Sequence, residues 1–156
     1  MNREMRRADR KITEAEAMQL LQNGEYGILS VCDGGLPYGV PLSYIFTAGK
    51  IYFHCAKSGR KWDSIAANRR VSFCVVGATQ PVVYDGSFTT RYESAIVEGV
   101  ASVIEDDAEK ADILTRLCEK YLPGNMDKVP EELQKGLAHT GVIAIEITGI
   151  SGKRRA

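Results

Sequence analysis

The sequence predicts a mainly β domain, a small barrel of six antiparallel strands decorated by a few helices. Three observations predict this class. Six segments are rich in β-branched, aromatic and other apolar residues, Gly- or Asp-containing turns separate several of them, and only short segments have the spacing of an amphipathic helix. The 156 residues, 44% of them hydrophobic and 26% charged, have the size and composition of one globular domain. We therefore expect a single domain over residues 1–156.

The first expected element is a short N-terminal helix. Thr13 and Glu16 have the spacing of a capping box, in which each side chain accepts a hydrogen bond from the other residue's backbone N–H. An apolar stripe follows over residues 17–21, and Gly24 is a typical stop signal.

Three strands with short turns come next. They span residues 26–32, 37–46 and 50–55, with turns at 33–35 and 48–49, and are expected to form an antiparallel meander. Pro37 and Pro41 cannot donate backbone hydrogen bonds, so the second strand should be an edge strand or a distorted one.

The remaining elements alternate between helix and strand. We expect a helix at 59–68, strands at 71–77 and 87–104, a helical insertion at about 107–138 made of helices 107–121 and 131–138, and a last strand at 141–148. Gly99 marks the expected bulge in the long strand.

Composition excludes several functional classes. Twenty basic and twenty acidic side chains give no net charge, which disfavours a nucleic-acid binder. No apolar run approaches the roughly 18 residues of a membrane span, and the charged N-terminus lacks the apolar stretch of a secretory signal, so a cytoplasmic location is expected. Four cysteines are scattered along the chain without ligand spacing, which favours free thiols over disulfides or a metal site.

Charge is uneven along the chain. Residues 1–70 carry 11 basic and 7 acidic side chains, whereas residues 71–156 carry 9 and 13. The basic half contains the best candidate anion site, a turn that enters the helix at 59–68. Backbone N–H groups at a helix N-terminus, together with Lys57, Ser58, Arg60 and Lys61, would suit a phosphate. A solvated basic turn is the alternative.

Three further features could face a ligand. His54 shares a strand face with Tyr52 just before this turn, although a hydrogen-bonded structural histidine is the alternative. The irregular strand at 37–46 would leave backbone groups free to meet a heteroaromatic ring, or is simply an irregular edge. The row Thr90, Tyr92 and Ser94 suits a pocket, a subunit interface or a solvated sheet face.

Several segments match one family of flavoproteins in order. The matching segments are 5–10 (MRRADR), 24–29 (GEYGIL), 37–44 (PYGVPLSY), 51–56 (IYFHCA), 59–61 (GRK), 92–94 (YES), 98–99 (EG) and the terminal strand with 148–153. The chain thereby resembles the pyridoxamine 5′-phosphate oxidase-like proteins that bind FMN in a split barrel, and within them the nitroimidazole-reductase branch.

The resemblance implies a homodimer with FMN in a groove between two barrels. Its implied cofactor-binding residues are Val40, Pro41, Leu42 and Ser43 beside the ring, His54, Cys55, Ala56, Arg60 and Lys61 at the ribityl chain and phosphate, and Thr90, Tyr92 and Ser94 from the partner subunit. Lys57 and Ser58 are added as cofactor-binding candidates because they belong to the basic turn. His54 is implied to lie near the reactive face of the flavin and is the candidate catalytic residue. No metal ligand is implied.

The expected function is an FMN-dependent reductase that passes electrons to a small acceptor such as a nitroaromatic. The chain lacks a dinucleotide-binding fingerprint, because Gly34 and Gly35 lie in a hairpin turn, so NADH or NADPH would bind only transiently over the flavin. The alternatives are an FMN carrier or redox sensor without turnover, and a split barrel that binds haem or a deazaflavin instead.

Overall fold

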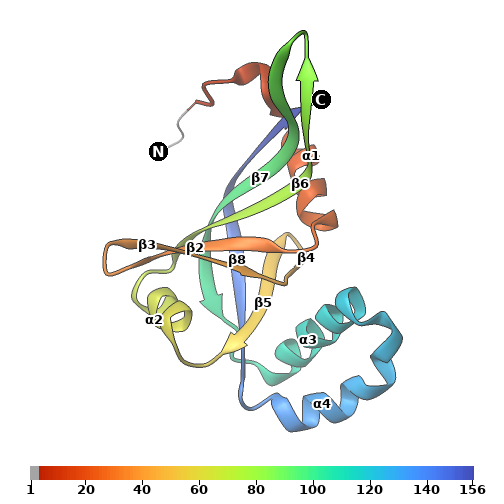
Figure 1. The fold of residues 1–156 in the computed structure, drawn as a ribbon. Coiled ribbons are helices and arrows are strands. Elements are labelled where there is room, and N and C mark those ends of the chain that lie inside the picture. The colour runs from red at the N-terminus through yellow and green to blue at the C-terminus, as the bar shows by residue number, and fades with distance from the viewer. Residues whose placement is uncertain (1–3) are drawn as a thin grey trace.

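The chain folds around one strongly curved antiparallel sheet, which a computed structural model describes for residues 4–156 (Figure 1). Residues 1–3, the start of the charged N-terminal segment, lie outside the described part. The strands are β1 (Lys11–Ile12), β2 (Gly27–Asp33), β3 (Leu36–Leu42), β4 (Ile45–Thr47), β5 (Lys50–Ala56), β6 (Arg70–Tyr84), β7 (Ser87–Val103) and β8 (Thr140–Arg155). The helices are η1 (Ala8–Arg10), α1 (Glu14–Asn23), α2 (Arg60–Ala67), α3 (Asp107–Tyr121), η2 (Pro123–Lys128) and α4 (Val129–Gly136).

The strand order is β3-β2-β6-β7-β8-β5-β4, with β1 added beside β8. The mainly β antiparallel class is confirmed, but the sheet in the described residues has eight strands where six were expected. One of the two additional strands is β1. The other arises because the segment 37–46 divides at Ser43 and Tyr44, where the Tyr44 N–H donates to the Tyr121 hydroxyl at 2.9 Å instead of to a neighbouring strand. The expected meander is thus interrupted between β3 and β4, which lie at opposite ends of the strand order.

Two of the three long strands extend further than their sequences indicate, whereas β7 closely matches its expected span of 87–104. β6 was expected to end at residue 77, yet it continues to Tyr84 because pairing with β7 resumes after a register shift between Val76 and Thr79. β8 continues beyond residue 148 to Arg155 because β7 pairs with it as far as that residue. The bulge at Gly99 is confirmed by a register shift there, where a Cβ atom would lie 2.7 Å from the Glu146 carbonyl oxygen.

The helix α1 covers one end of the curved sheet and packs against β8, β7 and β6. Its capping box is confirmed: the Thr13 hydroxyl accepts from the Glu16 N–H at 3.2 Å, and the Thr13 N–H donates to the Glu16 carboxylate at 2.8 Å. Gly24 ends the helix as expected. The fully buried Tyr44 ties α1 to the core, because its hydroxyl donates to the Leu21 carbonyl at 2.6 Å and its ring meets Phe73 edge to face.

The helices α3 and α4 lie on the outer side of β5, opposite the main core (Figure 1). A second apolar cluster forms here around Tyr52, Ile113, Leu117 and Val142. The helix α4 begins at Val129 and ends at Gly136, earlier than the expected 131–138, because a proline is tolerated in the first turn and Pro130 occupies it. None of the helices in residues 4–156 is both long and apolar enough to cross a membrane.

Candidate functional site

The turn between β5 and α2 presents an uncapped helix N-terminus. Gly59 is the N-cap of α2 and has a φ of 97°, in the left-handed region that favours glycine, and nothing lies within 4 Å of the position a Cβ atom would take. Within residues 4–156, no side chain caps this end of the helix. The first backbone N–H groups of α2 are therefore open to an anion, and the helix dipole adds positive potential at the same place.

The basic side chains of this turn differ in what they already bind. The Arg60 Nε donates to the Asp33 carboxylate at 2.6 Å, and the guanidinium lies 4.1 Å from the centre of the Tyr38 ring. The Lys57 ammonium donates to the Ala138 carbonyl at 2.7 Å. Lys61 has no carboxylate within ion-pair distance among the described residues, so its charge is the most available to a ligand.

Lys61 also acts on its neighbours. Its ammonium lies 5.5 Å from the centre of the Phe53 ring. Burial, together with the charge of Lys61, lowers the pKa of His54 below its ordinary value. The imidazole is therefore neutral at neutral pH and offers one N–H donor and one acceptor nitrogen.

The alternation predicted for β5 places His54 where a ligand can reach it. Phe53 and Cys55 point into the main core, whereas His54 lies on the opposite face, opposite Val142 of β8, and its side chain is exposed. Burial raises the pKa of the Cys55 thiol, which makes it an unreactive core side chain. Cys55 can meet a cofactor only through its backbone, while Ala56 and Ser58 are exposed.

The strand β3 is an edge strand, as its two prolines predict. Val40 and Leu42 are half-buried against the core, whereas Pro41 and Ser43 are exposed. Because β3 pairs only with β2 in the described part of the chain, part of its backbone faces away from the sheet without a strand partner there. Arg60 lies over Tyr38 of the same strand, so β3 and the α2 turn border one surface.

The row Thr90, Tyr92 and Ser94 lies far from this surface in the same chain. Tyr92 pairs with Arg155, whereas His54 pairs with Val142, so the two groups sit thirteen residues apart along β8, roughly 40 Å of strand. One chain therefore does not bring all the candidate residues together.

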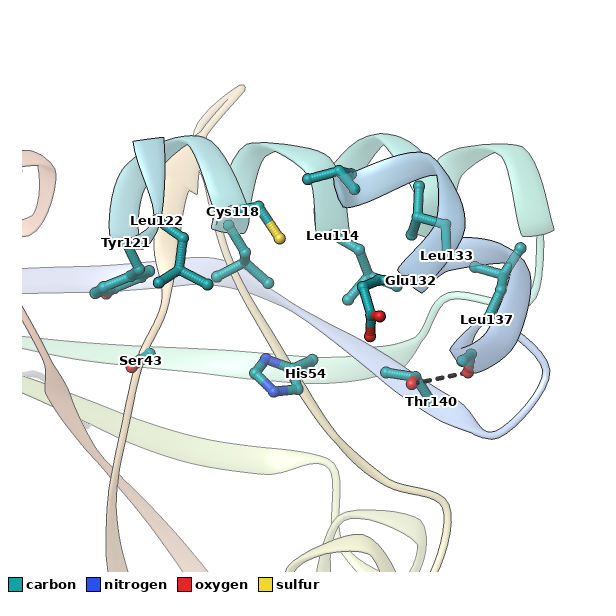
Figure 2. Close-up of a pocket in the computed structure, with 13 residues that line it drawn as sticks. Ser43, His54, Leu114, Cys118, Tyr121, Leu122, Glu132, Leu133, Leu137 and Thr140 are labelled. Carbon is teal, nitrogen blue, oxygen red and sulfur yellow. Dashed lines mark hydrogen bonds between the residues drawn. The ribbon is translucent and has the colours of Figure 1, made fainter. Parts of the chain in front are cut away.

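A pocket of about 390 Å³ lies beside His54 under the helices α3 and α4. Figure 2 shows His54 and Ser43 on the sheet side of this pocket and Leu114, Cys118 and Leu133 on the helix side. These helices were expected only to decorate the barrel, and their contribution to a pocket was not predicted. The sequence did contain a signal for an apolar surface on α3 beyond its buried face. Leu114 and Cys118 form a second apolar pair four residues apart beside that face.

Comparison with known proteins assigns the family. Residues 13–154 match the family model of pyridoxamine 5′-phosphate oxidase, and the chain belongs to this family. No curated protein matches the chain significantly.

Several solved structures share the fold. A candidate 5-nitroimidazole antibiotic resistance protein from Bacteroides thetaiotaomicron is 21% identical, with a TM-score of 0.79 over 92% of this chain and 85% of that one. A flavocytochrome from Azotobacter vinelandii is 19% identical, with a TM-score of 0.86 over 98% and 72%. An FAD and heme binding protein from Mycobacterium smegmatis is 22% identical, with a TM-score of 0.79 over 93% and 73%. At these identities the comparisons establish the split-barrel fold.

Proposed function

We propose that the chain binds FMN and uses it to reduce a small acceptor. The observation that carries this proposal is the open N-terminus of α2 beside Lys61 and Arg60, which suits a doubly charged phosphate. Membership in the pyridoxamine 5′-phosphate oxidase family supports a flavin, as do the flavin-binding neighbours.

The residues around the turn would hold the cofactor in separate ways. Lys61 and the first N–H groups of α2 bind the phosphate, and Arg60 shares its guanidinium between Asp33 and the ligand. The free edge of β3 at Val40 and Pro41 offers backbone groups to the ring. When bound, the flavin supplies reversible two-electron chemistry, with NADH or NADPH as the expected external reductant.

His54 would position the acceptor. Reduction of a nitro group to a nitroso group takes two electrons and two protons and releases water. A neutral imidazole, which the lowered pKa favours at neutral pH, donates an N–H hydrogen bond to an acceptor oxygen and holds it in place. This role matches the exposed position of His54 beside the α2 turn.

The working unit is proposed to be a homodimer. The outer face of β2, β6 and β7 carries a row of registered side chains, Ile28, Cys74 and Ile96, of which Ile28 and Ile96 are 36% and 47% exposed. Ser94 lies on the same face, opposite the exposed Val76. A second chain on this face would cover the apolar row and could bring the remote Thr90–Ser94 row to the other chain's cofactor.

The absorption spectrum tests the proposal. Purified protein incubated with FMN should show protein-bound flavin absorption, bleach with NADPH or NADH, and reoxidise when a nitroaromatic is added. The double variant Arg60→Ala, Lys61→Ala should lose most of its affinity for FMN. A Soret band in place of flavin absorption, or full retention of FMN by the double variant, would overturn the assignment, whereas bleaching without acceptor-dependent reoxidation would indicate a carrier or sensor.

Light scattering tests the homodimer. The wild-type chain should have the mass of two chains, and Ile96→Lys should shift it toward one. Met18→Lys, a change at a similarly exposed apolar residue of α1, is the matched control and should leave the dimer intact. A monomeric wild-type chain would refute the dimer.

A further inference from the structure

The helices α3 and α4 form a roof over the sheet beside His54. The pocket beneath this roof has a volume of about 390 Å³, within the range of about 300–1,000 Å³ typical of small-molecule sites. Its helix side is apolar and includes Leu114, Leu122 and Leu133. Figure 2 shows His54, Ser43 and Thr140 at the sheet side, and the first two are residues also expected to meet the flavin.

Hydrogen bonds hold the C-terminal end of α3 on the sheet. The Tyr121 hydroxyl donates to the Glu25 carbonyl at 2.6 Å and accepts from the Tyr44 N–H at 2.9 Å. The Lys120 ammonium donates to the Gly24 carbonyl at 2.7 Å. This end of the roof is therefore fixed to the loop between α1 and β2 and, through Tyr44, to the corner between β3 and β4.

The other end of the roof is held by two lysines. Lys110 is 3% exposed, and its ammonium bridges the Asp107 carboxylate at 3.1 Å and the Leu137 carbonyl at 2.9 Å, which joins the start of α3 to the end of α4. Lys57 donates to the Ala138 carbonyl and joins the roof to the turn before α2. The pocket is thus preformed, with both helices anchored around it.

We infer that this pocket binds the apolar ring of the electron acceptor and selects neutral acceptors over carboxylates. The inference rests on the proposed function and names the substrate class for the same site. A ring against Leu114 and Leu133 would bury apolar surface on the helix side. Its reducible group would then reach His54 on the floor, on the side where the flavin is expected.

Glu132 supplies the discrimination against anions. Figure 2 shows its carboxylate directed from α4 toward the sheet, on the side of His54 and Thr140. The side chain is 72% exposed and lies 3.6 Å from the Lys135 ammonium, so solvent and this partner screen its charge. An acceptor carboxylate would meet a like charge at the rim, with an effect of about threefold on affinity.

Protection of Cys118 from alkylation tests occupancy without relying on turnover. Cys118 lines the pocket, whereas the exposed Cys32 on β2 lies outside it and is an internal reference. In FMN-loaded protein treated with iodoacetamide, 4-nitrobenzyl alcohol should slow modification of Cys118 several-fold and leave Cys32 unchanged, with weaker protection by 4-nitrobenzoate. Equal rates at Cys118 with and without the alcohol would overturn the inference, as would full protection by FMN alone, because the pocket would then belong to the cofactor.

Two variants extend the test to selectivity. Leu133→Gln should raise the KM for 4-nitrobenzyl alcohol about tenfold with a smaller change in kcat. Met18→Gln, at an apolar residue 38% exposed on α1, is the control and should leave KM unchanged. Glu132→Gln should reduce the ratio of the KM for 4-nitrobenzoate to the KM for 4-nitrobenzyl alcohol about threefold.

These outcomes separate the inference from the proposed function. If Leu133→Gln turns over with an unchanged KM and Cys118 is not protected, the acceptor pocket is refuted and the proposed reductase activity stands. If Cys118 is protected but the protein shows no flavin-dependent turnover, ligand binding in the pocket is supported and the proposed reductase activity is refuted.

Discussion

The ion pair between Asp33 and Arg60 allows a sharp test of the phosphate site. In the free chain the Asp33 carboxylate already occupies the Arg60 Nε at 2.6 Å, and both side chains are partly exposed, 42% and 48%. An FMN phosphate on the other side of the guanidinium would feel this carboxylate as a nearby negative charge. We therefore predict that Asp33→Asn strengthens FMN binding.

The magnitude follows from Coulomb's law. A phosphate of about two negative charges at about 7 Å from the carboxylate is repelled by about 1 kcal/mol in a water-like dielectric, which corresponds to roughly fivefold in affinity. The Tyr38 ring, 4.1 Å from the guanidinium carbon, should keep Arg60 in place without its partner. The gain should shrink at high salt because the charges are exposed.

Flavin fluorescence titration measures the effect, and riboflavin is the control ligand because it lacks the phosphate. Asp33→Asn should lower the Kd for FMN and leave the Kd for riboflavin unchanged. Asp112→Asn, which removes a similarly exposed ion pair with Arg116 on α3, should change neither. Weaker FMN binding in Asp33→Asn would show that Asp33 is needed to orient Arg60, and an equal change for riboflavin would place the phosphate elsewhere.

Four further outcomes are expected. Tyr44→Phe should lower the free energy of unfolding in urea by about 2 kcal/mol, because it leaves a buried helix carbonyl without its donor; no change in the urea midpoint would contradict the buried bond. His54→Ala should keep FMN affinity within about twofold and slow acceptor reduction by about tenfold or more. In the wild-type chain, the lowered pKa of His54 should keep steady-state rates level through neutral pH, with a change only in the more acidic range. The Thr13 backbone N–H, aided by Arg154, lowers the pKa of Glu16 to about 2, so the stability that Glu16 adds is complete above its ordinary carboxyl range and is lost as pH falls toward that value. The difference in thermal midpoint between wild type and Glu16→Gln should therefore vanish in acid.

The sequence was sufficient to predict elements that local chemistry determines. The capping box at Thr13, the edge character of β3 and the bulge at Gly99 each depend on a few neighbouring residues, and each is confirmed. The alternation of β5 was likewise enough to separate the core residues Phe53 and Cys55 from His54.

Features that depend on distant partners were not predictable. β6 passes beyond Gly77 because β7 continues to pair with it after a register shift between Val76 and Thr79. Residues 82–84 before the turn at Asp85 and Gly86 are typical of a hairpin, but the sequence does not show that this hairpin continues the strand at 71–77. Asp33 looks like an ordinary turn residue until the fold brings Arg60 to it, 27 positions along the chain. The pocket under α3 and α4 could not be predicted either, because contacts between distant residues hold these helices in place. Lys110 bonds to the Leu137 carbonyl and Tyr121 to the Glu25 carbonyl.

The hydrogen bond from Lys57 to Ala138 connects the two places where cofactor and acceptor are expected to bind. The same ammonium belongs to the turn expected to receive the phosphate and to the anchor of the roof, so a phosphate that drew it away from the Ala138 carbonyl would release that anchor. A ligand that held the roof closed would then weaken phosphate binding, and thermodynamic reciprocity requires the phosphate to weaken that ligand by the same factor. The order in which cofactor and acceptor load would thereby depend on a single lysine that touches neither reacting atom.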